Sequence, residues 1–229
     1  MTIRLSPRLQ RIADFMPPGS TIADVGTDHA YLPLWLLQTG RCDTAFATEL
    51  RSGPLQNAAS DAAAAGVSDQ LTLLLCDGLT RCSPDDVDTV VIAGMGGETI
   101  QGILDASPWA LEKRLILQPQ TKFSELRLFL ASRGVGIADA ALVYDTGRIY
   151  RVWLAASGVP AESGWIESPL LRKRDPLLKA YTEDLIKRLR KQIRGLECAT
   201  TTDKNQLALL HAELEEYLTI HKEAESWQM

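Results

Sequence analysis

The stretch "TIADVGTDHAYLP", residues 21–33, decides how the chain folds. It begins like a buried strand, and Gly26 then predicts a tight turn where that strand ends. Dinucleotide-binding turns continue with further glycines, which let the backbone approach a pyrophosphate. Here Asp28, His29 and Ala30 follow instead. An acid in this turn would repel a pyrophosphate, so we expect an open parallel sheet that binds a different ligand.

Strand and helix patterns alternate after this turn. The predicted strands lie at about 21–25, 44–48, 71–76, 88–93 and 114–118, with helices between them at about 32–38, 54–65, 98–106 and 121–133. Two more strands, at about 136–144 and 149–156, are separated only by "DTGR", which predicts a hairpin. The sequence therefore predicts a Rossmann-like α/β domain, with a mostly parallel seven-stranded sheet that ends in an antiparallel hairpin.

The N-terminal segment predicts a helix before the first strand. Ser6 is a candidate N-cap, and Pro7 suits the first helical position. Arg4, Arg8 and Arg11 recur at spacings that would place them on one face of this helix. That face has two interpretations, either a solvated surface or a contact with RNA.

A different pattern begins after Ser157. The stretch "SGVPAESGWIESP" is rich in Gly, Pro and Ser, which is typical of a linker. Beyond it, mostly apolar residues recur every three to four positions in two series. The first is Leu178, Tyr181, Leu185, Leu189, Ile193 and Leu196, and the second is Leu207, Leu210, Leu214, Tyr217, His221 and Ala224. They predict two antiparallel helices with an apolar seam, as in a helical hairpin or coiled coil. We therefore expect a first domain over residues 1–160 and a helical arm over residues 161–229.

Composition excludes several classes of protein. No run of about 18 apolar residues is present, and the N-terminus lacks the apolar region of a signal peptide. We therefore expect a cytoplasmic protein without a membrane partner. The four cysteines lack the spacing of zinc ligands, which predicts reduced thiols and no metal site.

Charge is distributed unevenly along the chain. The formal net charge is −5, yet residues 172–194 hold nine Lys or Arg and only three Asp or Glu. Residues 197–225 hold two basic residues against seven acidic ones, so cross-helix ion pairs could neutralise part of the basic helix. A local basic surface on an acidic protein is typical of contact with a nucleic-acid backbone.

Polar or glycine residues follow the predicted parallel strands, at the edge where open sheets bind ligands. Glu49 ends the second strand 23 residues after Gly26, a position from which a carboxylate binds ribose hydroxyls. Asp77 follows the third strand, where it could accept a hydrogen bond from an adenine amino group. The fourth strand ends in "AGMGG", whose glycines let the backbone approach a ligand. A cationic nucleoside matches these acids, and S-adenosylmethionine is the cofactor we expect.

Four segments together resemble one family, namely "LSPRLQRIADFMP", "DVGTDHAYLP", "IAGMGG" and "ILQPQ". They are similar to the bacterial tRNA (adenine-22-N1)-methyltransferases, which join a class I methyltransferase domain to a C-terminal coiled coil. The resemblance covers Leu5 to about Leu154, and the helical tail agrees in character. One departure is Gln120, because the family often has Asn after the Gln-Pro pair.

The resemblance implies methyl transfer from S-adenosylmethionine to N1 of a tRNA adenine. The lone pair of N1 is itself the nucleophile in this reaction. Adenine N1 lies on the pairing edge, so the base must be unpaired or extruded first. We expect Asp28, His29 and Tyr31 at the reacting base. Asp28 or a neighbouring backbone carbonyl would accept from the adenine amino group, and the two rings would orient or stack the base. The expected cofactor contacts are Asp24, Gly26, Glu49, Leu50, Asp77, Gly78, Gly94, Met95 and Gly96. The expected tRNA contacts are Arg8, Arg11, Gln118, Pro119, Lys187, Arg190 and Lys191.

Many of these residues also have a purely structural interpretation. Asp24 and Asp77 could hold their turns, Asp28 could cap a helix, and Tyr31 could belong to the core. The alternative functions are a nucleotide-dependent oxidoreductase, a non-catalytic RNA-binding module, and a methyltransferase for another RNA, a protein or a small molecule. Asp28 and the terminal hairpin argue against the oxidoreductase, and the basic helix argues against a small-molecule substrate. We expect a monomer, with dimerisation through the coiled coil as the alternative.

Overall fold

The computed structural model describes residues 3–27, 29–198 and 203–227. The chain divides into two compact units, Met1–Ala161 and Glu162–Met229. The first unit contains a sheet with its helices, and the second contains helices. Within the described residues, no helix is both long enough and apolar enough to cross a membrane.

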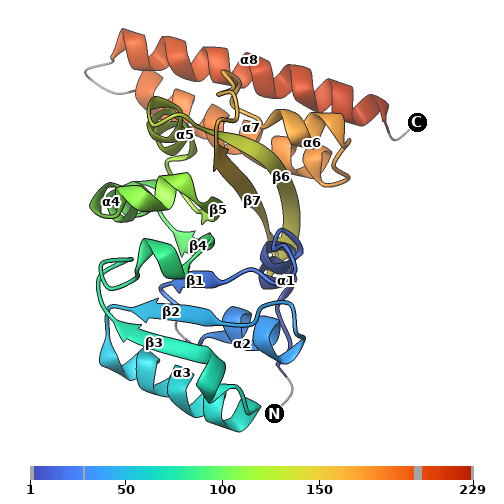
Figure 1. The fold of residues 1–229 in the computed structure, drawn as a ribbon. Helices are drawn as coiled ribbons and strands as arrows, with labels where there is room; N and C mark the ends of the chain where they lie inside the picture. The colour runs from blue at the N-terminus through green and yellow to red at the C-terminus, as the bar shows by residue number, and fades with distance from the viewer. Residues whose placement is uncertain (1–2, 28, 199–202, 228–229) are drawn as a thin grey trace. The chain divides into compact units, whose positions relative to one another are not determined.

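The sheet of the first unit has the predicted architecture. Its strands are β1 (Ile22–Val25), β2 (Ala45–Glu49), β3 (Leu71–Leu75), β4 (Thr89–Met95), β5 (Arg114–Pro119), β6 (Val135–Asp145) and β7 (Arg148–Ser157). They form one seven-stranded sheet in the order β3-β2-β1-β4-β5-β7-β6 (Figure 1). The strands β1 to β5 are parallel, and β6 and β7 form an antiparallel hairpin in which β7 pairs with β5. The Rossmann-like fold with a terminal hairpin is confirmed.

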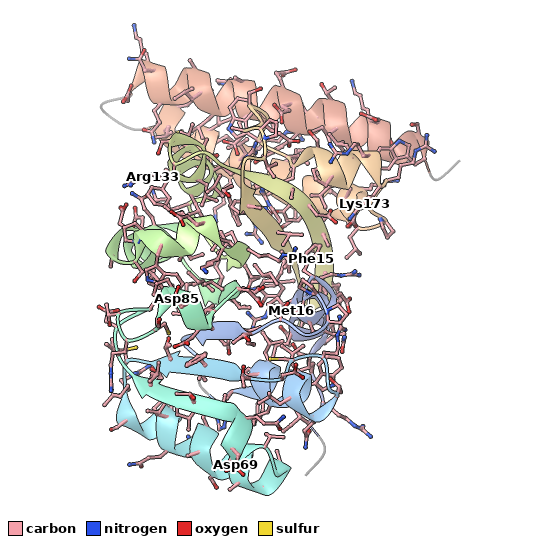
Figure 2. All side chains as sticks on the ribbon, in the orientation of Figure 1. Phe15, Met16, Asp69, Asp85, Arg133 and Lys173 are labelled. Atoms are coloured by element: carbon pink, nitrogen blue, oxygen red, sulfur yellow. The ribbon has the colours of Figure 1, made fainter. Side chains whose placement is uncertain are left out.

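Helices cover the sheet. They are α1 (Pro7–Asp14), α2 (Tyr31–Gln38), α3 (Ser52–Ala65), α4 (Gly97–Ala106) and α5 (Phe123–Ser132). The first three share a buried core with strand residues such as Ile22. Met16, just after α1, lies in this core, whereas Asp69 and Asp85 stay at the surface (Figure 2). Ala23 is fully buried like its neighbour Ile22, so both faces of the sheet are covered, as parallel strands require.

Two chain reversals form where the local sequence predicts them. Gly66 ends α3 in the left-handed conformation, with a φ of +73° that glycine adopts without strain. Thr146 and Gly147 have φ values of +45° and +81°, and they connect the paired residues Asp145 and Arg148. A two-residue loop with positive φ at both positions matches the twist of a hairpin, so this turn sets the register of β6 and β7.

The second unit contains α6 (Ser168–Arg172), α7 (Leu178–Glu197) and α8 (Lys204–Ser226). The two long helices are antiparallel, as predicted. Lys179 near the start of α7 contacts Glu225 at 3.2 Å, and Glu197 at its end contacts His211 at 3.8 Å. The linker prediction misses α6, because a five-residue helix with a proline in its first turn shows no periodicity.

The seam between α7 and α8 differs in part from the predicted one. Thr182 and Ile186 are buried, whereas Leu185 and Leu196, which the spacing favoured, are only half-buried. Thr182 Oγ1 lies 3.0 Å from His221 Nδ1, which makes a polar contact across the seam. The two antiparallel helices are confirmed, and a coiled-coil geometry stays a prediction.

Candidate active site

The strand order of the sheet reverses between β1 and β4, and open α/β sheets bind ligands at such switch points. The turn after β1 contains Gly26, whose φ is +72° and whose N–H donates to Thr48 O at 2.8 Å. A Cβ atom on Gly26 would overlap the methyl group of Met95, which ends β4. The two turns predicted to bind the cofactor therefore meet side by side, and the positive φ favours glycine at this position.

Glu49 lies at the carboxyl end of β2, beside the Gly26 turn, and its side chain is oriented by the backbone that follows it. Its Oε1 atom accepts hydrogen bonds from the N–H groups of Leu50 at 3.0 Å and Arg51 at 3.2 Å. Only 9% of Glu49 is exposed, and its Oε2 atom has no hydrogen-bond partner among the described residues. A buried carboxylate with one oxygen available suits the two hydroxyl groups of a ribose.

The end of β3 lies next to Glu49, because Cys76 N–H donates to Glu49 O at 3.0 Å. Asp77 is exposed, and the backbone oxygen of Asp77 accepts from the Thr80 hydroxyl at 2.9 Å. No partner for the Asp77 carboxylate is found among the described residues, so it is available to a ligand. The adjoining Gly78 has a φ of +55°. Leu50 is 66% exposed at the same edge.

Asp24 supports the Gly26 turn from within the sheet. Burial raises the pKa of its carboxyl to about 6, although a hydrogen bond from Thr27 partly opposes this shift. In that bond Thr27 Oγ1 donates to Asp24 Oδ2 at 2.6 Å. The structure therefore shows Asp24 holding the turn, and its direct contact with the cofactor stays a prediction.

Two aromatic rings follow the Gly26 turn. His29 and Tyr31 stack with ring centroids 5.1 Å apart and planes 10° apart. Tyr31 is 38% exposed at the start of α2, so it does not belong to the core. His29 Nδ1 lies 3.3 Å from Asp61 Oδ2, a carboxylate on α3. Asp28, the third residue expected at the reacting base, lies outside the described residues.

Asp61 is a site residue that the sequence reasoning missed. It lies 32 positions from His29, in the alanine-rich helix α3, and no local motif marks it. Its contact restrains the imidazole ring against which Tyr31 packs. Asp61 therefore joins the candidate site through its contact with His29.

The ends of β4 and β5 are joined by one buried amide. Gln118 is fully buried, and its Oε1 atom accepts from Gly94 N–H at 3.1 Å and from Arg8 Nη1 at 2.7 Å. The same Arg8 guanidinium lies 5.5 Å from the centre of the Tyr150 ring. Pro119 is also buried, so the structure shows Gln118 and Pro119 supporting this turn, and their direct contact with tRNA stays a prediction.

Glycines let the turn after β4 pack closely against the chain after β5. Gly97 N–H donates to Thr121 O at 2.9 Å, and a Cβ atom on Gly97 would lie 2.6 Å from Lys122 O. Gly96 precedes α4 as its N-terminal cap residue. Gln120, where the sequence departs from the family pattern, is exposed, and its backbone N–H donates to Met95 O at 2.9 Å.

The three N-terminal arginines do not form the predicted row on one helix face. Ser6 caps α1 through a hydrogen bond from Leu9 N–H at 3.3 Å, so Arg4 precedes the helix. Arg8 is directed toward Gln118 as described, whereas Arg11 is exposed and lies 3.6 Å from Asp14. The helix begins at Pro7, as its N-cap predicts, so Arg4 lies outside it and the three side chains do not share a helix face.

The basic residues of α7 belong to the second unit. Lys187 pairs with Glu183 on the same helix at 2.7 Å, instead of across the seam. Arg190 and Lys191 are exposed and have no ion pair among the described residues. Two of the three cations expected to contact tRNA are therefore available on this surface.

Among the described residues, no group of three or more His, Cys, Asp or Glu side chains is placed to hold a metal ion. The candidate site at the carboxyl edge of the sheet has acids, glycines and aromatic rings. A nucleoside with a cationic group matches it better than a phosphate does.

Comparison with known proteins assigns the chain to a family. Residues 5–153 match a family model described as a methyltransferase domain. The tRNA (adenine(22)-N(1))-methyltransferase of Bacillus subtilis (strain 168) is 31% identical over 195 residues, covering 80% of this chain and 82% of that protein. The chain belongs to the tRNA (adenine(22)-N(1))-methyltransferase family. The resemblance carried by the four sequence segments is confirmed.

Solved structures of the family share the architecture over nearly the whole chain. The crystal structure of the B. subtilis m1A22 tRNA methyltransferase TrmK has a TM-score of 0.83 and 26% identity, covering 96% of this chain and 99% of that one. The structure of Streptococcus pneumoniae Sp1610 in complex with S-adenosyl-L-methionine has a TM-score of 0.75 and 28% identity, covering 95% of this chain and 100% of that one.

Proposed function

We propose that this protein transfers a methyl group from S-adenosylmethionine to N1 of adenine 22 in tRNA. The observation that carries the proposal is Glu49, a buried carboxylate held by two backbone N–H groups with Oε2 available beside the Gly26 turn. The name of the B. subtilis relative and the bound cofactor in Streptococcus pneumoniae Sp1610 support the same reaction.

The residues at the carboxyl edge of the sheet fit the proposed cofactor. Glu49 binds the ribose hydroxyls, and Asp77 accepts from the adenine amino group. The turns at Gly26 and at Gly94 to Gly96 let the backbone approach the ligand. When bound, S-adenosylmethionine supplies a methyl group that its positively charged sulfur makes ready for transfer.

The reacting adenine needs to be held and aligned more than it needs to be activated. Its N1 lone pair forms the new N–C bond as the S–C bond breaks, so no side chain has to remove a proton beforehand. The stacked pair of His29 and Tyr31 offers a flat surface for the extruded base. Asp28 accepts from the adenine amino group and stabilises the positive charge that the base gains.

The second unit extends this function to the body of the tRNA. In this proposal residues 1–160 form the methyltransferase domain, and residues 161–229 form a coiled-coil arm that binds the tRNA backbone. Lys187, Arg190 and Lys191 lie on the helix that gives residues 172–194 their nine basic and three acidic side chains. The protein works in the cytoplasm. It works as a monomer, since α7 and α8 bury their apolar seam against each other.

The reaction can be tested with purified protein, methyl-labelled S-adenosylmethionine and unmodified tRNA transcripts. Transcripts with A22 should yield 1-methyladenosine by nucleoside mass spectrometry, and otherwise identical transcripts with G22 should yield none. Labelling of both transcripts would show that the methylated adenine is not at position 22. Cofactor binding without any labelled tRNA would overturn the substrate assignment.

The role of the base-handling residues can be tested separately. Asp28→Asn and His29→Ala should lower kcat much more than they lower affinity for S-adenosylmethionine, whereas Asp69→Asn, at an exposed surface position, should change neither. Isothermal titration with S-adenosylmethionine and steady-state kinetics give the two quantities. Unchanged kcat in both site variants would contradict their assignment.

A further inference from the structure

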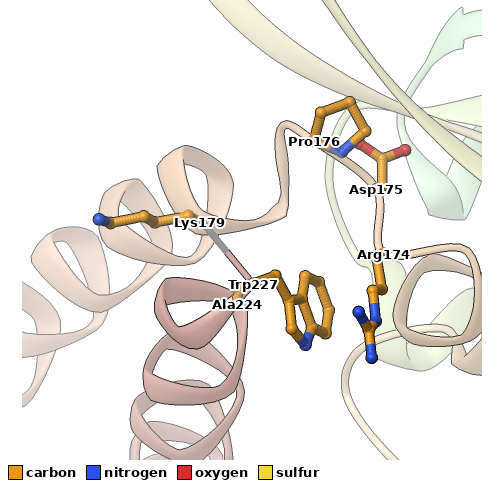
Figure 3. A pocket seen from close by; sticks show the side chains of 6 residues that line it. All are labelled: Arg174, Asp175, Pro176, Lys179, Ala224 and Trp227. Atoms are coloured by element: carbon orange, nitrogen blue, oxygen red, sulfur yellow. The ribbon is translucent and has the colours of Figure 1, made fainter. Parts of the chain in front are cut away.

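A small pocket in the second unit has no part in the function proposed above. It lies where the end of α8 meets the loop between α6 and α7, and its cavity volume is about 210 Å³. Its lining residues are Arg174, Asp175, Pro176, Lys179, Ala224 and Trp227 (Figure 3). Pockets for drug-sized ligands measure about 300–1,000 Å³, so this pocket, the Trp227 pocket, has room for a single ring system.

Arg174 has a strained backbone conformation at the edge of this pocket. It follows the end of α6, where helices commonly place a left-handed glycine, and its φ is +51°. Its N–H donates to Leu171 O at 3.0 Å, and Asp175 N–H donates to Leu170 O at 2.9 Å. Both hydrogen bonds involve only backbone atoms, so glycine would complete this helix end equally well and without strain. The backbone therefore gives no reason for an arginine here, and what distinguishes the residue from glycine is its side chain, which lies over the Trp227 ring.

The side chains give the pocket one aromatic face and one cation. The Arg174 guanidinium carbon lies 5.9 Å from the centre of the Trp227 indole ring. Trp227 is half-buried, which leaves part of its ring open to a ligand, and Arg174 is exposed. Lys179 contributes its stem, but its ammonium group points away from the indole in Figure 3 and pairs with Glu225 at 3.2 Å.

An anionic ligand with a planar ring matches this pair of groups. Aromatic side chains stack on unpaired bases, and guanidinium groups bind phosphates. The pocket also lies at the start of residues 172–194, which hold nine basic and three acidic residues. An unpaired nucleotide in RNA carries a flat base and a phosphate on the same unit, so it offers both complementary groups together.

We propose that the Trp227 pocket holds one unstacked nucleotide of the tRNA substrate, with its base on the Trp227 indole and its phosphate at Arg174. The inference rests on the proposed function in one respect, since it takes tRNA as the ligand. It gives the arm a contact with a base, in addition to the backbone contacts expected of its basic helix.

The test measures tRNA binding by fluorescence anisotropy, with full-length variants. Trp227→Ala should weaken tRNA binding about 10-fold, and Trp227→Phe by less than about threefold, because a phenyl ring still stacks. Arg174→Gly suits the left-handed backbone, so it should fold at least as well as the wild type. It should still weaken binding, and it should lower the slope of log Kd against log salt by about one.

A matched control is available in the first unit. The Arg41 guanidinium lies 5.8 Å from the centre of the Trp35 ring, so Arg41→Ala also removes a cation from an indole, at a site with no proposed ligand. This variant should bind tRNA like the wild type. In both Trp227→Ala and Arg174→Gly, KM for tRNA should rise, while kcat and KM for S-adenosylmethionine stay unchanged.

The outcomes separate this inference from the proposed function. Wild-type tRNA affinity in both pocket variants, with normal methylation, would overturn the pocket assignment alone and leave the proposed function intact. A loss confined to Trp227→Ala and accompanied by a lower melting temperature would also overturn it, because Trp227 would then serve packing only. If the wild type binds but does not methylate tRNA, the proposed function fails, and weaker binding by the pocket variants would still support the pocket.

Discussion

Replacing Glu49 by glutamine changes the proposed ribose contact with little change to the surrounding backbone. The glutamine oxygen can still accept from the N–H groups of Leu50 and Arg51, which now lie 3.0 and 3.2 Å from Glu49 Oε1. The substitution removes the negative charge and replaces the available Oε2 atom by an amide nitrogen, which donates instead of accepting. The effect should therefore appear in cofactor binding more than in folding.

The size of the effect follows from the charge of the acceptor. A hydrogen bond to a charged group contributes about 1.5–3 kcal/mol, so losing one should raise the Kd for S-adenosylmethionine roughly 10- to 150-fold. At saturating cofactor and tRNA, kcat should fall by less than about fivefold, because His29 and Tyr31 are untouched. A rise in KM with nearly constant kcat is the pattern expected of a contact that serves binding.

Isothermal titration with S-adenosylmethionine measures this directly, and Glu112→Gln, at an exposed position of the same unit, is the control. Glu49→Ala should show the same loss of affinity and, in addition, a lower melting temperature, because it leaves the two N–H groups without their acceptor. A Kd for Glu49→Gln within about twofold of the wild type, with the protein folded, would refute the reasoning.

Three further changes test the turn and its neighbours. Gly26→Ala should lower the melting temperature by roughly 2–8 °C, because a left-handed φ costs about 1–2 kcal/mol and the new Cβ overlaps Met95. Adding Met95→Ala should recover part of this loss in calorimetry, and an unchanged melting temperature in Gly26→Ala would contradict the contact. Asp61→Asn should lower kcat about 2- to 10-fold through His29, with KM for S-adenosylmethionine unchanged; equal loss in both parameters in steady-state kinetics would point to a general structural role. Asp24 has a folded pKa of about 6 against 3.8, so the folded state holds the extra proton, and stability falls as pH rises from about 4 to 6. Asp24→Asn removes this titration, so its free energy of unfolding relative to the wild type should rise by about 2 kcal/mol between pH 4 and pH 8. Urea unfolding across this range measures the gain, and parallel curves for both proteins would exclude it.

Local sequence signals were sufficient for the first unit because each element is short and clearly bounded. The strand expected at 44–48 is Ala45–Glu49, and the turn "DTGR" forms the predicted hairpin. The seam of the arm shows the limit of such signals. Leu185 and Ile186 both fit a three-to-four residue spacing, and only the position of the partner helix selects Ile186 for burial.

The residues of the candidate site also fall into those that the sequence predicts and those that it does not. Gly26 and Glu49 could be predicted because parallel strands bring their carboxyl ends to one edge of the sheet, whatever the side-chain details. Asp61 could not, because its contact with His29 depends on how α3 packs beside the turn. The contact between Arg8 and Gln118 joins residues 110 positions apart and is equally invisible to local patterns.

In the turn after β1, side chains stand where a dinucleotide-binding turn has exposed backbone N–H groups. Ala30 takes a left-handed conformation, with a φ of +54°, where glycine would be less strained, and its N–H donates to Thr27 O at 2.8 Å. This conformation starts α2 at Tyr31 and leaves the Tyr31 ring stacked on His29. A pyrophosphate requires exposed N–H groups at a helix start, whereas an extruded base requires flat surfaces. The chain has two stacked rings here, together with a strained Ala30 backbone where α2 begins. This departure from a glycine-rich turn therefore favours contact with a base over the binding of a phosphate.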